Sequence, residues 1–327
     1  MGRLLAILAA VVINGGLLIA IFGYLALRAY EGAGPLPTQK RMVIEYGTGV
    51  PAIGRELEEA GVVSDARLFR LAVRLEGKGD ELKAGEYDFP AEISLAQTVA
   101  ALVRGPNVSR RITVPEGLTS AQVVLLIEAA DGLRGHVSEI PPEGTLLPET
   151  YSYTWNDDRQ AIVRRMRQAM DQTLAELWEQ RAPDLPFKTP EEAVTMASIV
   201  EKETGVARER PLVASVFMNR LRRGMRLQSD PTVIYALTAG KGPLDRPLTR
   251  ADWQVDSPYN TYVVAGLPAG PIANPGRESL QAVLNPVDSD YLYFVADGSG
   301  GHAFARSLDE HNRNVARWRR VRDSVAN

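Results

Sequence analysis

Two carboxylates, Glu201 and Glu203, lie two positions apart at the end of a mostly apolar segment, in the run SIVEKET. A carboxyl group beside apolar side chains resists ionisation, and its pKa rises toward that of a working general acid. In a helix the two would lie on opposite flanks, so they would not act as a pair on one substrate. Helix geometry alone does not choose between them. The alternative is that either one is ion-paired with an arginine such as Arg208 or Arg210, because structural ion pairs also perturb pKa values.

The helix that would carry both carboxylates has a strong start signal. Thr189 can cap it, Pro190 suits the first helical position, and Glu192 completes a capping box. The pattern ends at Gly205, a residue typical of helix termini. Thr195, Ser198 and Lys202 form one narrow polar strip, and nearly all other side chains of the segment are apolar, which predicts a mostly buried helix.

Composition excludes several classes of chemistry. The formal net charge of -3 over 327 residues gives no electrostatic case for nucleic acid as the main partner. The absence of cysteine excludes a thiolate nucleophile, a cysteine zinc site and a disulfide scaffold. The three histidines are far apart and lack metal-ligand spacing, so we expect neither a metal nor a cofactor.

The N-terminus predicts a membrane anchor. No charged residue occurs from Leu4 to Leu27, a run long enough to span a bilayer and too long for the apolar core of a cleaved signal peptide. Arg3 precedes the run and Arg28 follows it, so the positive-inside bias is weak. It leans toward a cytoplasmic N-terminus on a single-pass protein of the inner (cytoplasmic) membrane, with the bulk of the chain outside. A buried helix of a soluble protein is the alternative.

The rest of the chain mixes short strand and helix patterns, which predicts an α+β fold. We expect a tip and anchor over residues 1–30, a linker over 31–40, a small module over 41–115 and a larger mixed domain over 116–327. Within the module the order strand, helix, helix, strand resembles a LysM-type glycan-binding module. That pattern is weak by itself, because many small α+β domains share it.

Several long motifs carry a more specific resemblance. They follow one another in order along the chain: LLPETY (146–151), ASIVEKETG (197–205), ASVFMNRLRRGMRLQSDPTVIY (214–235), SPYNTY (257–262), GLPAGPIANPG (266–276) and YLYFVADGSGGHAF (291–304). Together they resemble the endolytic murein transglycosylases of the YceG-like family over essentially the whole chain. Long motifs in a fixed order are far more specific than a lone short pattern. One departure is Ala269, where the family often has a second proline.

The resemblance implies a lytic reaction on peptidoglycan. It places the catalytic acid/base on the first glutamate of VEKE, Glu201. Such enzymes cleave the β-1,4 bond between N-acetylmuramic acid and N-acetylglucosamine without water and close a 1,6-anhydro ring. One well-placed carboxyl can serve both steps, whereas ordinary glycosidases need two.

Several residues that follow the two glutamates are candidates to bind the substrate. Asp230-Pro231 predicts first of all a helix start with Asp230 as the N-cap, while Gln228 just before it is a candidate to face the sugar. Tyr259, Asn260 and Tyr262 lie in a loop, and their aromatic and amide groups suit sugar rings and acetamido groups. Loop tyrosines are also common in packing, and the resemblance favours Asn260 for the cleft.

The combined prediction is an enzyme of cell-wall biogenesis that acts on nascent glycan strands beside the membrane. The resemblance also implies a peptidoglycan synthase complex as partner. Two alternatives remain open. A hydrolytic muramidase would need a second carboxylate, such as Asp230, in the cleft. A membrane-anchored, non-enzymatic peptidoglycan-binding protein would tolerate the loss of Glu201.

Overall fold

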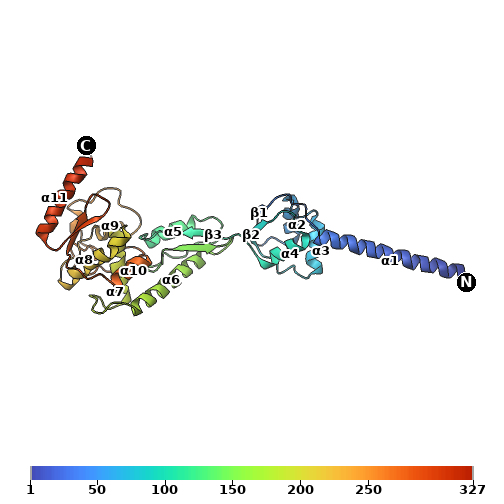
Figure 1. Cartoon of the computed structure of the whole chain (residues 1–327), viewed down its shortest axis with the longest axis horizontal. Coiled ribbons are helices and arrows are strands. Elements are labelled where there is room, and N and C mark those ends of the chain that lie inside the picture. The colour runs from blue at the N-terminus through green and yellow to red at the C-terminus, as the bar shows by residue number, and fades with distance from the viewer. Residues whose placement is uncertain (1, 326–327) are drawn as a thin grey trace. The chain divides into compact units, whose positions relative to one another are not determined.

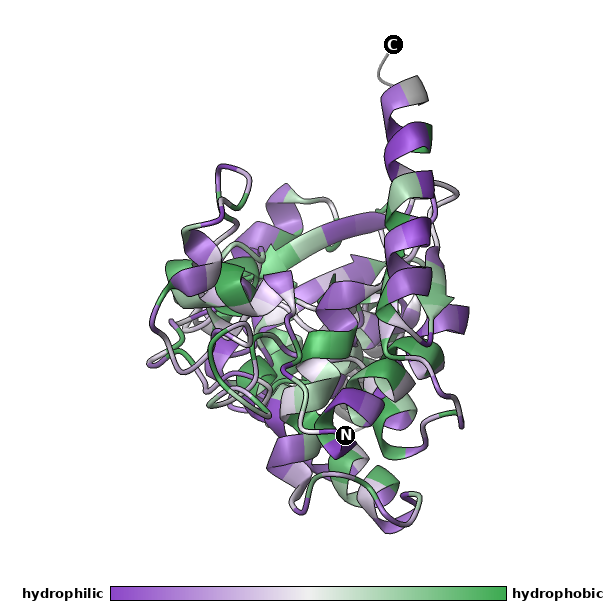
Figure 2. Ribbon diagram, turned by 90° about the vertical axis from the view of Figure 1, so that its left-hand side faces the viewer, coloured by the Kyte–Doolittle hydropathy of each residue, from purple (hydrophilic) through white to green (hydrophobic). Residues whose placement is uncertain are grey.

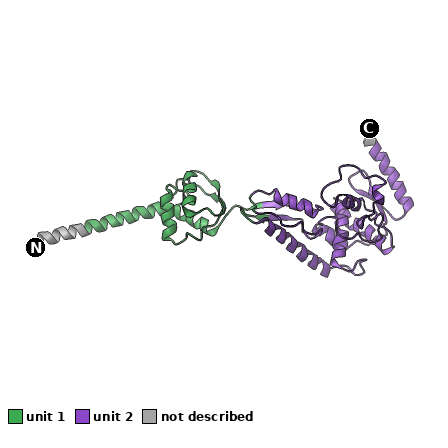
Figure 3. Cartoon of the chain, turned by 180° about the vertical axis from the view of Figure 1, so that it is seen from behind, with its two compact units in different colours: residues 1–110, 132–134, 152–157 green, residues 111–131, 135–151, 158–327 purple. Residues whose placement is uncertain are grey.

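The computed structural model describes residues 2–325, and side chains from residue 13 to residue 323. The chain forms two compact units (Figures 1 and 3). Unit 1 comprises residues 1–110, 132–134 and 152–157, and unit 2 comprises residues 111–131, 135–151 and 158–327. Unit 1 therefore includes two short segments from later in the chain.

Unit 1 begins with the long apolar helix α1 (Gly2–Glu31). Of the described residues, only its stretch Ile13–Glu31 is long and apolar enough to cross a membrane. The predicted order strand, helix, helix, strand follows as β1 (Lys40–Ile44), α2 (Val50–Glu59), α3 (Ala66–Leu75) and β2 (Gly85–Phe89). The helix α4 (Leu95–Arg104) comes after β2. The mixed α+β class is therefore confirmed, whereas the likeness to a LysM module stays a prediction.

Local signals account for the elements of unit 1. The Asp65 carboxylate accepts a hydrogen bond from the Arg67 amide at the start of α3, and Ser94 forms a capping box with Gln97 at the start of α4. The strands β1 and β2 pair antiparallel, with Met42 opposite Tyr87. The core beneath them is apolar and fully enclosed, and its largest side chains are Tyr87, Phe69, Phe89, Ile44, Leu57 and Leu102.

Unit 2 contains most of the remaining elements, and its boundary with unit 1 falls within two short strands, β3 (Arg110–Thr113) and β4 (Thr150–Tyr153). Its helices are α5 (Ser120–Glu128), α6 (Arg159–Glu179), α7 (Pro190–Glu203), α8 (Arg210–Arg222), α9 (Asp230–Thr238), α10 (Arg277–Leu284) and α11 (Leu308–Val325). The strands β5 (Tyr293–Ala296) and β6 (His302–Ala305) form an antiparallel hairpin. The last helix, α11, is coloured mostly as hydrophilic in Figure 2, as its many arginines require.

The core of unit 2 is built around α7, which packs against α8, α10 and α6. Eight consecutive residues of α7, from Ala193 to Val200, are buried. A helix enclosed on nearly all sides must be mostly apolar, and the buried hydroxyls of Thr195 and Ser198 donate to backbone carbonyls of the same helix. The two glutamates follow at the point where α7 leaves this core.

Candidate active site

The helix α7 begins as its sequence predicts. The Thr189 side chain accepts from the Glu192 amide, the Glu192 side chain accepts from the Thr189 amide, and Pro190 occupies the first turn. Inside the core, the Ser198 hydroxyl accepts from the Ile272 amide at 3.0 Å. These bonds fix the position of the helix along its axis, and therefore the position of the carboxyls at its end.

Glu201 lies in a partly buried ion-pair cluster. Its side chain is 4% exposed. One carboxylate oxygen accepts from the Gly276 amide at 2.9 Å, and the other accepts from Arg210 at 3.2 Å. The same guanidinium contacts Glu116 at 2.9 Å and also pairs with Glu278. Both oxygens of Glu201 are thus occupied by strong donors, an arrangement that suits a fixed carboxylate. The alternative considered for this helix, an ion pair with a nearby arginine, is therefore present between Glu201 and Arg210.

Glu203 lies in a different setting at the last residue of α7. The residue is half-buried, and Ser229 Oγ donates a hydrogen bond of 2.5 Å to its Oε1. Burial raises the pKa of Glu203 to about 7, and the charge of Asp230 acts in the same direction. The Ser229 hydrogen bond and the charges of His302 and Arg220 oppose the rise. A carboxyl that is partly protonated at neutral pH can donate a proton and take one back.

An aromatic pair stands beside this carboxyl. The rings of Trp253 and Tyr262 stack with centroids 5.6 Å apart and an interplanar angle of 19°. Trp253 Nε1 and the Tyr262 hydroxyl both donate to Oδ1 of Asp230, at 3.0 and 2.7 Å. Tyr262 and Asp230 are close enough to Glu203 for their charges to act on one another. A stacked, partly exposed aromatic surface beside a carboxyl of raised pKa suits a polar ring-shaped ligand.

A family model described as the YceG-like family matches residues 42–317. The chain belongs to this family. Curated relatives of this YceG-like chain include two proteins named endolytic murein transglycosylase. The one from Streptococcus pneumoniae (strain D39) is 30% identical over 322 residues, which cover 84% of this chain and 57% of the relative. The one from Bacillus subtilis (strain 168) is 33% identical over 302 residues, covering 83% and 82%.

A solved structure extends the family likeness to the fold. The crystal structure of a yceG-like protein from Listeria monocytogenes superposes with a TM-score of 0.53 at 32% sequence identity. The match covers 84% of this chain and 98% of the other. This YceG-like chain spans little more than half the length of the streptococcal relative.

The residues predicted to bind substrate lie in different surroundings. Asp230 and Tyr262 come together beside Glu203, as described above. Asn260 is fully buried, and its amide nitrogen donates to the carbonyls of Trp253 and Val255 while its oxygen accepts from the Tyr262 amide. The side chain of Asn260 thus shapes the loop that holds the aromatic pair.

Gln228 and Tyr259 differ in their exposure and packing. Gln228 is exposed, and its backbone is in the left-handed region at φ +53°. Tyr259 packs against Tyr235, with ring centroids 4.8 Å apart. The expected capping role of Asp230 is wrong: Ser229 is the N-cap residue, and Asp230 is the first helical residue. The reason is that the Asp230 carboxylate receives the donors of the aromatic pair, which lie outside its own helix.

Sequence reasoning missed two residues of this site, Ser229 and Trp253. Ser229 lies between Gln228 and Asp230, both of which were predicted to bind substrate. Its hydroxyl, a hydrogen-bond donor, was the signal that could have identified it. Trp253 carried no local signal apart from being a tryptophan in a polar loop. Within the described part of the chain, no group of three or more His, Asp or Glu residues could hold a metal ion.

Proposed function

We propose that this protein is a membrane-anchored endolytic lytic transglycosylase that cleaves the β-1,4 bond between N-acetylmuramic acid and N-acetylglucosamine in peptidoglycan. The relatives named endolytic murein transglycosylase support the reaction class. The observation that carries the mechanism is the half-buried carboxyl of Glu203, whose pKa of about 7 suits proton exchange at neutral pH.

The proposed reaction needs a single carboxyl. Protonated Glu203 gives its proton to the glycosidic oxygen as the bond from that oxygen to the muramic acid C1 breaks. The resulting carboxylate takes the proton of the 6-hydroxyl, whose oxygen bonds to C1 and closes the 1,6-anhydro ring. The group returns to its starting form, and no water is consumed. Because a pKa near the working pH populates both forms, Glu203 can act in both directions.

The family resemblance assigns the acid/base to Glu201, and that assignment remains the alternative. The geometry favours a positioning role for Glu201. Its carboxylate joins the Gly276 amide to Arg210, which in turn holds Glu116 and Glu278. A proton donor must release its proton to substrate, and a carboxylate with both oxygens bonded inside the fold is poorly placed for this.

We further propose that the glycan strand lies along the aromatic pair Trp253 and Tyr262, with Gln228 at the edge of the same surface. The hydrolytic alternative has one observation in its favour, because the carboxylate of Asp230 acts electrostatically on Glu203. A retaining or inverting hydrolase would use such a second carboxylate. Here Asp230 accepts two hydrogen bonds from aromatic side chains, which favours a structural role for its carboxylate.

The localisation and partners belong to the same proposal. The apolar stretch of α1 is a candidate membrane span, so we propose single-pass anchorage in the cytoplasmic membrane with the N-terminus inside. Nascent glycan and a peptidoglycan synthase complex are then the expected partners outside the membrane.

The test uses the full-length protein in detergent with uncrosslinked glycan strands, and mass spectrometry of the products. We expect 1,6-anhydro ends from the wild type, a loss of at least about 100-fold in Glu203→Gln, and the same anhydro product from Glu201→Gln. Circular dichroism of both variants checks that they fold. Activity that survives in Glu203→Gln but not in folded Glu201→Gln would return the acid/base to Glu201. Reducing ends would identify a hydrolase, and glycan binding without cleavage would favour the non-enzymatic alternative.

A further inference from the structure

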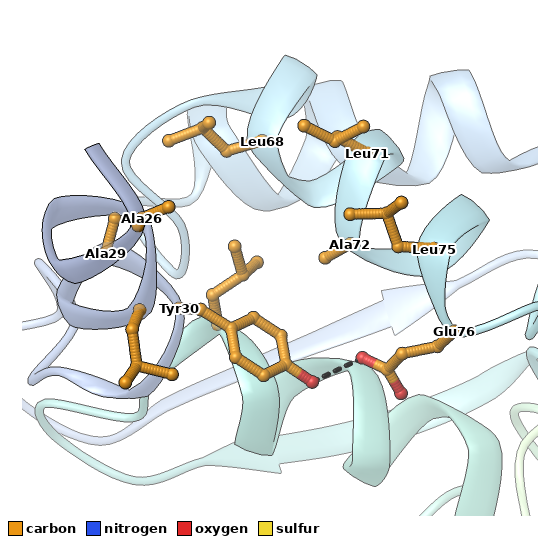
Figure 4. A pocket seen from close by; sticks show the side chains of 11 residues that line it. Ala26, Ala29, Tyr30, Leu68, Leu71, Ala72, Leu75 and Glu76 are labelled. Carbon is orange, nitrogen blue, oxygen red and sulfur yellow. Dashed lines mark hydrogen bonds between the residues drawn. The ribbon is translucent and has the colours of Figure 1, made fainter. Parts of the chain in front are cut away.

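Unit 1 contains a groove of about 430 Å³ between the C-terminal turns of α1 and one face of α3. Its lining is mainly aliphatic and includes Ala26, Leu27, Leu68, Leu71 and Leu75. Figure 4 shows the side chains of the two helices around this space, where the Tyr30 hydroxyl donates to the Glu76 carboxylate. That bond ties the end of α1 to the end of α3 and so defines one side of the groove.

The helix α3 has more apolar surface than its core contacts require. Phe69, Ala72 and Val73 are buried in the core of unit 1. On another face of the helix, Leu68, Leu71 and Leu75 remain 41%, 51% and 78% exposed. Their positions fall within about 60° of one another around the helix, so they form one continuous stripe. Exposed leucines that gather in one stripe mark a contact surface.

A basic stripe runs beside the leucines. Arg67, Arg70 and Arg74 are exposed and fall within about 60° of one another, on the side next to the leucine stripe. None of the three forms an ion pair with any residue that the structure describes. A helix with an arginine stripe next to an apolar stripe is typical of helices that lie at a membrane surface.

The end of α1 places this surface at the level of the lipid headgroups. The uncharged run from Leu4 to Leu27 is about 36 Å long at 1.5 Å per residue, whereas a bilayer core is about 30 Å thick. The groove is lined by the last turns of that run and by the residues just after it. Arg28 lies over the ring of Tyr24 at 5.8 Å, and such aromatic and basic residues mark a membrane interface.

We propose that the groove holds an acyl chain of a phospholipid from the bilayer that α1 spans, and that the arginine stripe contacts an anionic headgroup. The inference rests on the membrane anchorage proposed above and is independent of the reaction. The occupant follows from three observations: the apolar lining, the adjacent positive charge, and the continuity of one wall with the candidate span. A lipid seated there gives unit 1 a second attachment to the membrane and fixes its tilt.

The test measures how close α3 lies to lipid in the full-length protein. The chain has no cysteine, so single cysteines can be labelled with a fluorophore. The probe position is Leu71→Cys in the groove. The matched control is Glu45→Cys, an exposed position directly after β1. In Figure 1 the strand β1 lies on the side of unit 1 away from α1. A third label at Leu18→Cys in α1 reports anchorage itself. The protein is reconstituted in phosphatidylglycerol or phosphatidylcholine vesicles that contain lipids with a nitroxide quencher in the upper acyl chain.

We expect quenching at Leu71→Cys to be at least threefold that at Glu45→Cys. Adding Arg67→Gln, Arg70→Gln and Arg74→Gln should lower it at least twofold in phosphatidylglycerol and leave it unchanged in phosphatidylcholine. Equal quenching at positions 71 and 45, with strong quenching at position 18, would overturn the inference while the anchorage stands. Weak quenching at position 18 would contradict both the lipid-binding groove and the membrane anchorage. Loss of quenching at position 71 on addition of a polyprenyl phosphate would assign the groove to a polyprenyl chain and overturn the phospholipid assignment.

Discussion

Glu201 and Glu203 are two residues apart in α7, yet their carboxyls face different partners. Arg210 and the Gly276 amide bind Glu201, whereas Ser229 binds Glu203. The half-turn between them separates a carboxylate fixed by charge from a carboxyl whose pKa is raised by burial to about 7. One short helical segment thus presents one group suited to structure and one suited to proton transfer.

The pH dependence of cleavage should follow Glu203. Because the acid form starts the reaction, kcat/KM should fall above about pH 7 and be about 100-fold lower at pH 9 than at pH 6. Ser229→Ala removes a hydrogen bond that favours the carboxylate, so the descending limb should move to higher pH. Initial rates on glycan strands between pH 5 and pH 9 measure both effects. A limb that moves to lower pH in Ser229→Ala would contradict this assignment.

Glu203 should also make stability depend on pH. Its pKa rises on folding from 4.5 to about 7, so between these values the folded state holds a proton that the unfolded state releases. Stability should therefore fall as pH rises through this window, by about 3 kcal/mol in total. The difference between the wild type and Glu203→Gln in thermal unfolding, at pH 4.5 and pH 8, isolates this effect. If the two proteins respond to pH in parallel, the raised pKa is refuted.

The start of α7 and its burial could be predicted from the sequence because their causes are local. Thr189, Pro190 and Glu192 form the capping arrangement within four residues, and the apolar run that follows requires a buried helix. The same holds for most helices and strands of unit 1. The sequence also indicated, as an alternative, an ion pair of Glu201 with a nearby arginine such as Arg210.

The surroundings of Glu203 could not be predicted in the same way. They depend on how the segment at Ser229 and the loop that contains Trp253 and Tyr262 fold against the end of α7. These contacts join residues more than 20 positions apart. Helical spacing fixes the angle between Glu201 and Glu203, but not which flank meets a basic side chain. Asp230 illustrates the limit, since its local capping signal is overridden by donors from a distant loop.

Loss of Arg210 should destabilise unit 2. Arg210→Met leaves Glu201 buried without its counter-charge and leaves Glu116 without its partner. Breaking a buried pair in this way costs about 3–5 kcal/mol, or at least about 6 °C in the midpoint of thermal unfolding for a domain of this size. The double variant Arg210→Met with Glu201→Gln removes the uncompensated charge and should recover part of the loss. Tryptophan fluorescence of the full-length protein in detergent follows the transition, and equal midpoints for Arg210→Met and the wild type would show that the cluster contributes little.

The aromatic pair should control substrate affinity and leave the product unchanged. Trp253→Ala removes the stacked surface and one donor to Asp230, so we expect kcat/KM to fall about tenfold, mainly through KM, with the 1,6-anhydro product retained. Trp253→Phe keeps an aromatic ring without the donor and should retain most of the affinity. The matched control is Trp318→Ala, which removes a partly exposed tryptophan from α11. A fall in kcat at unchanged KM would instead place Trp253 in the chemical step, and an equal loss in Trp318→Ala would show that the effect is not specific to this surface.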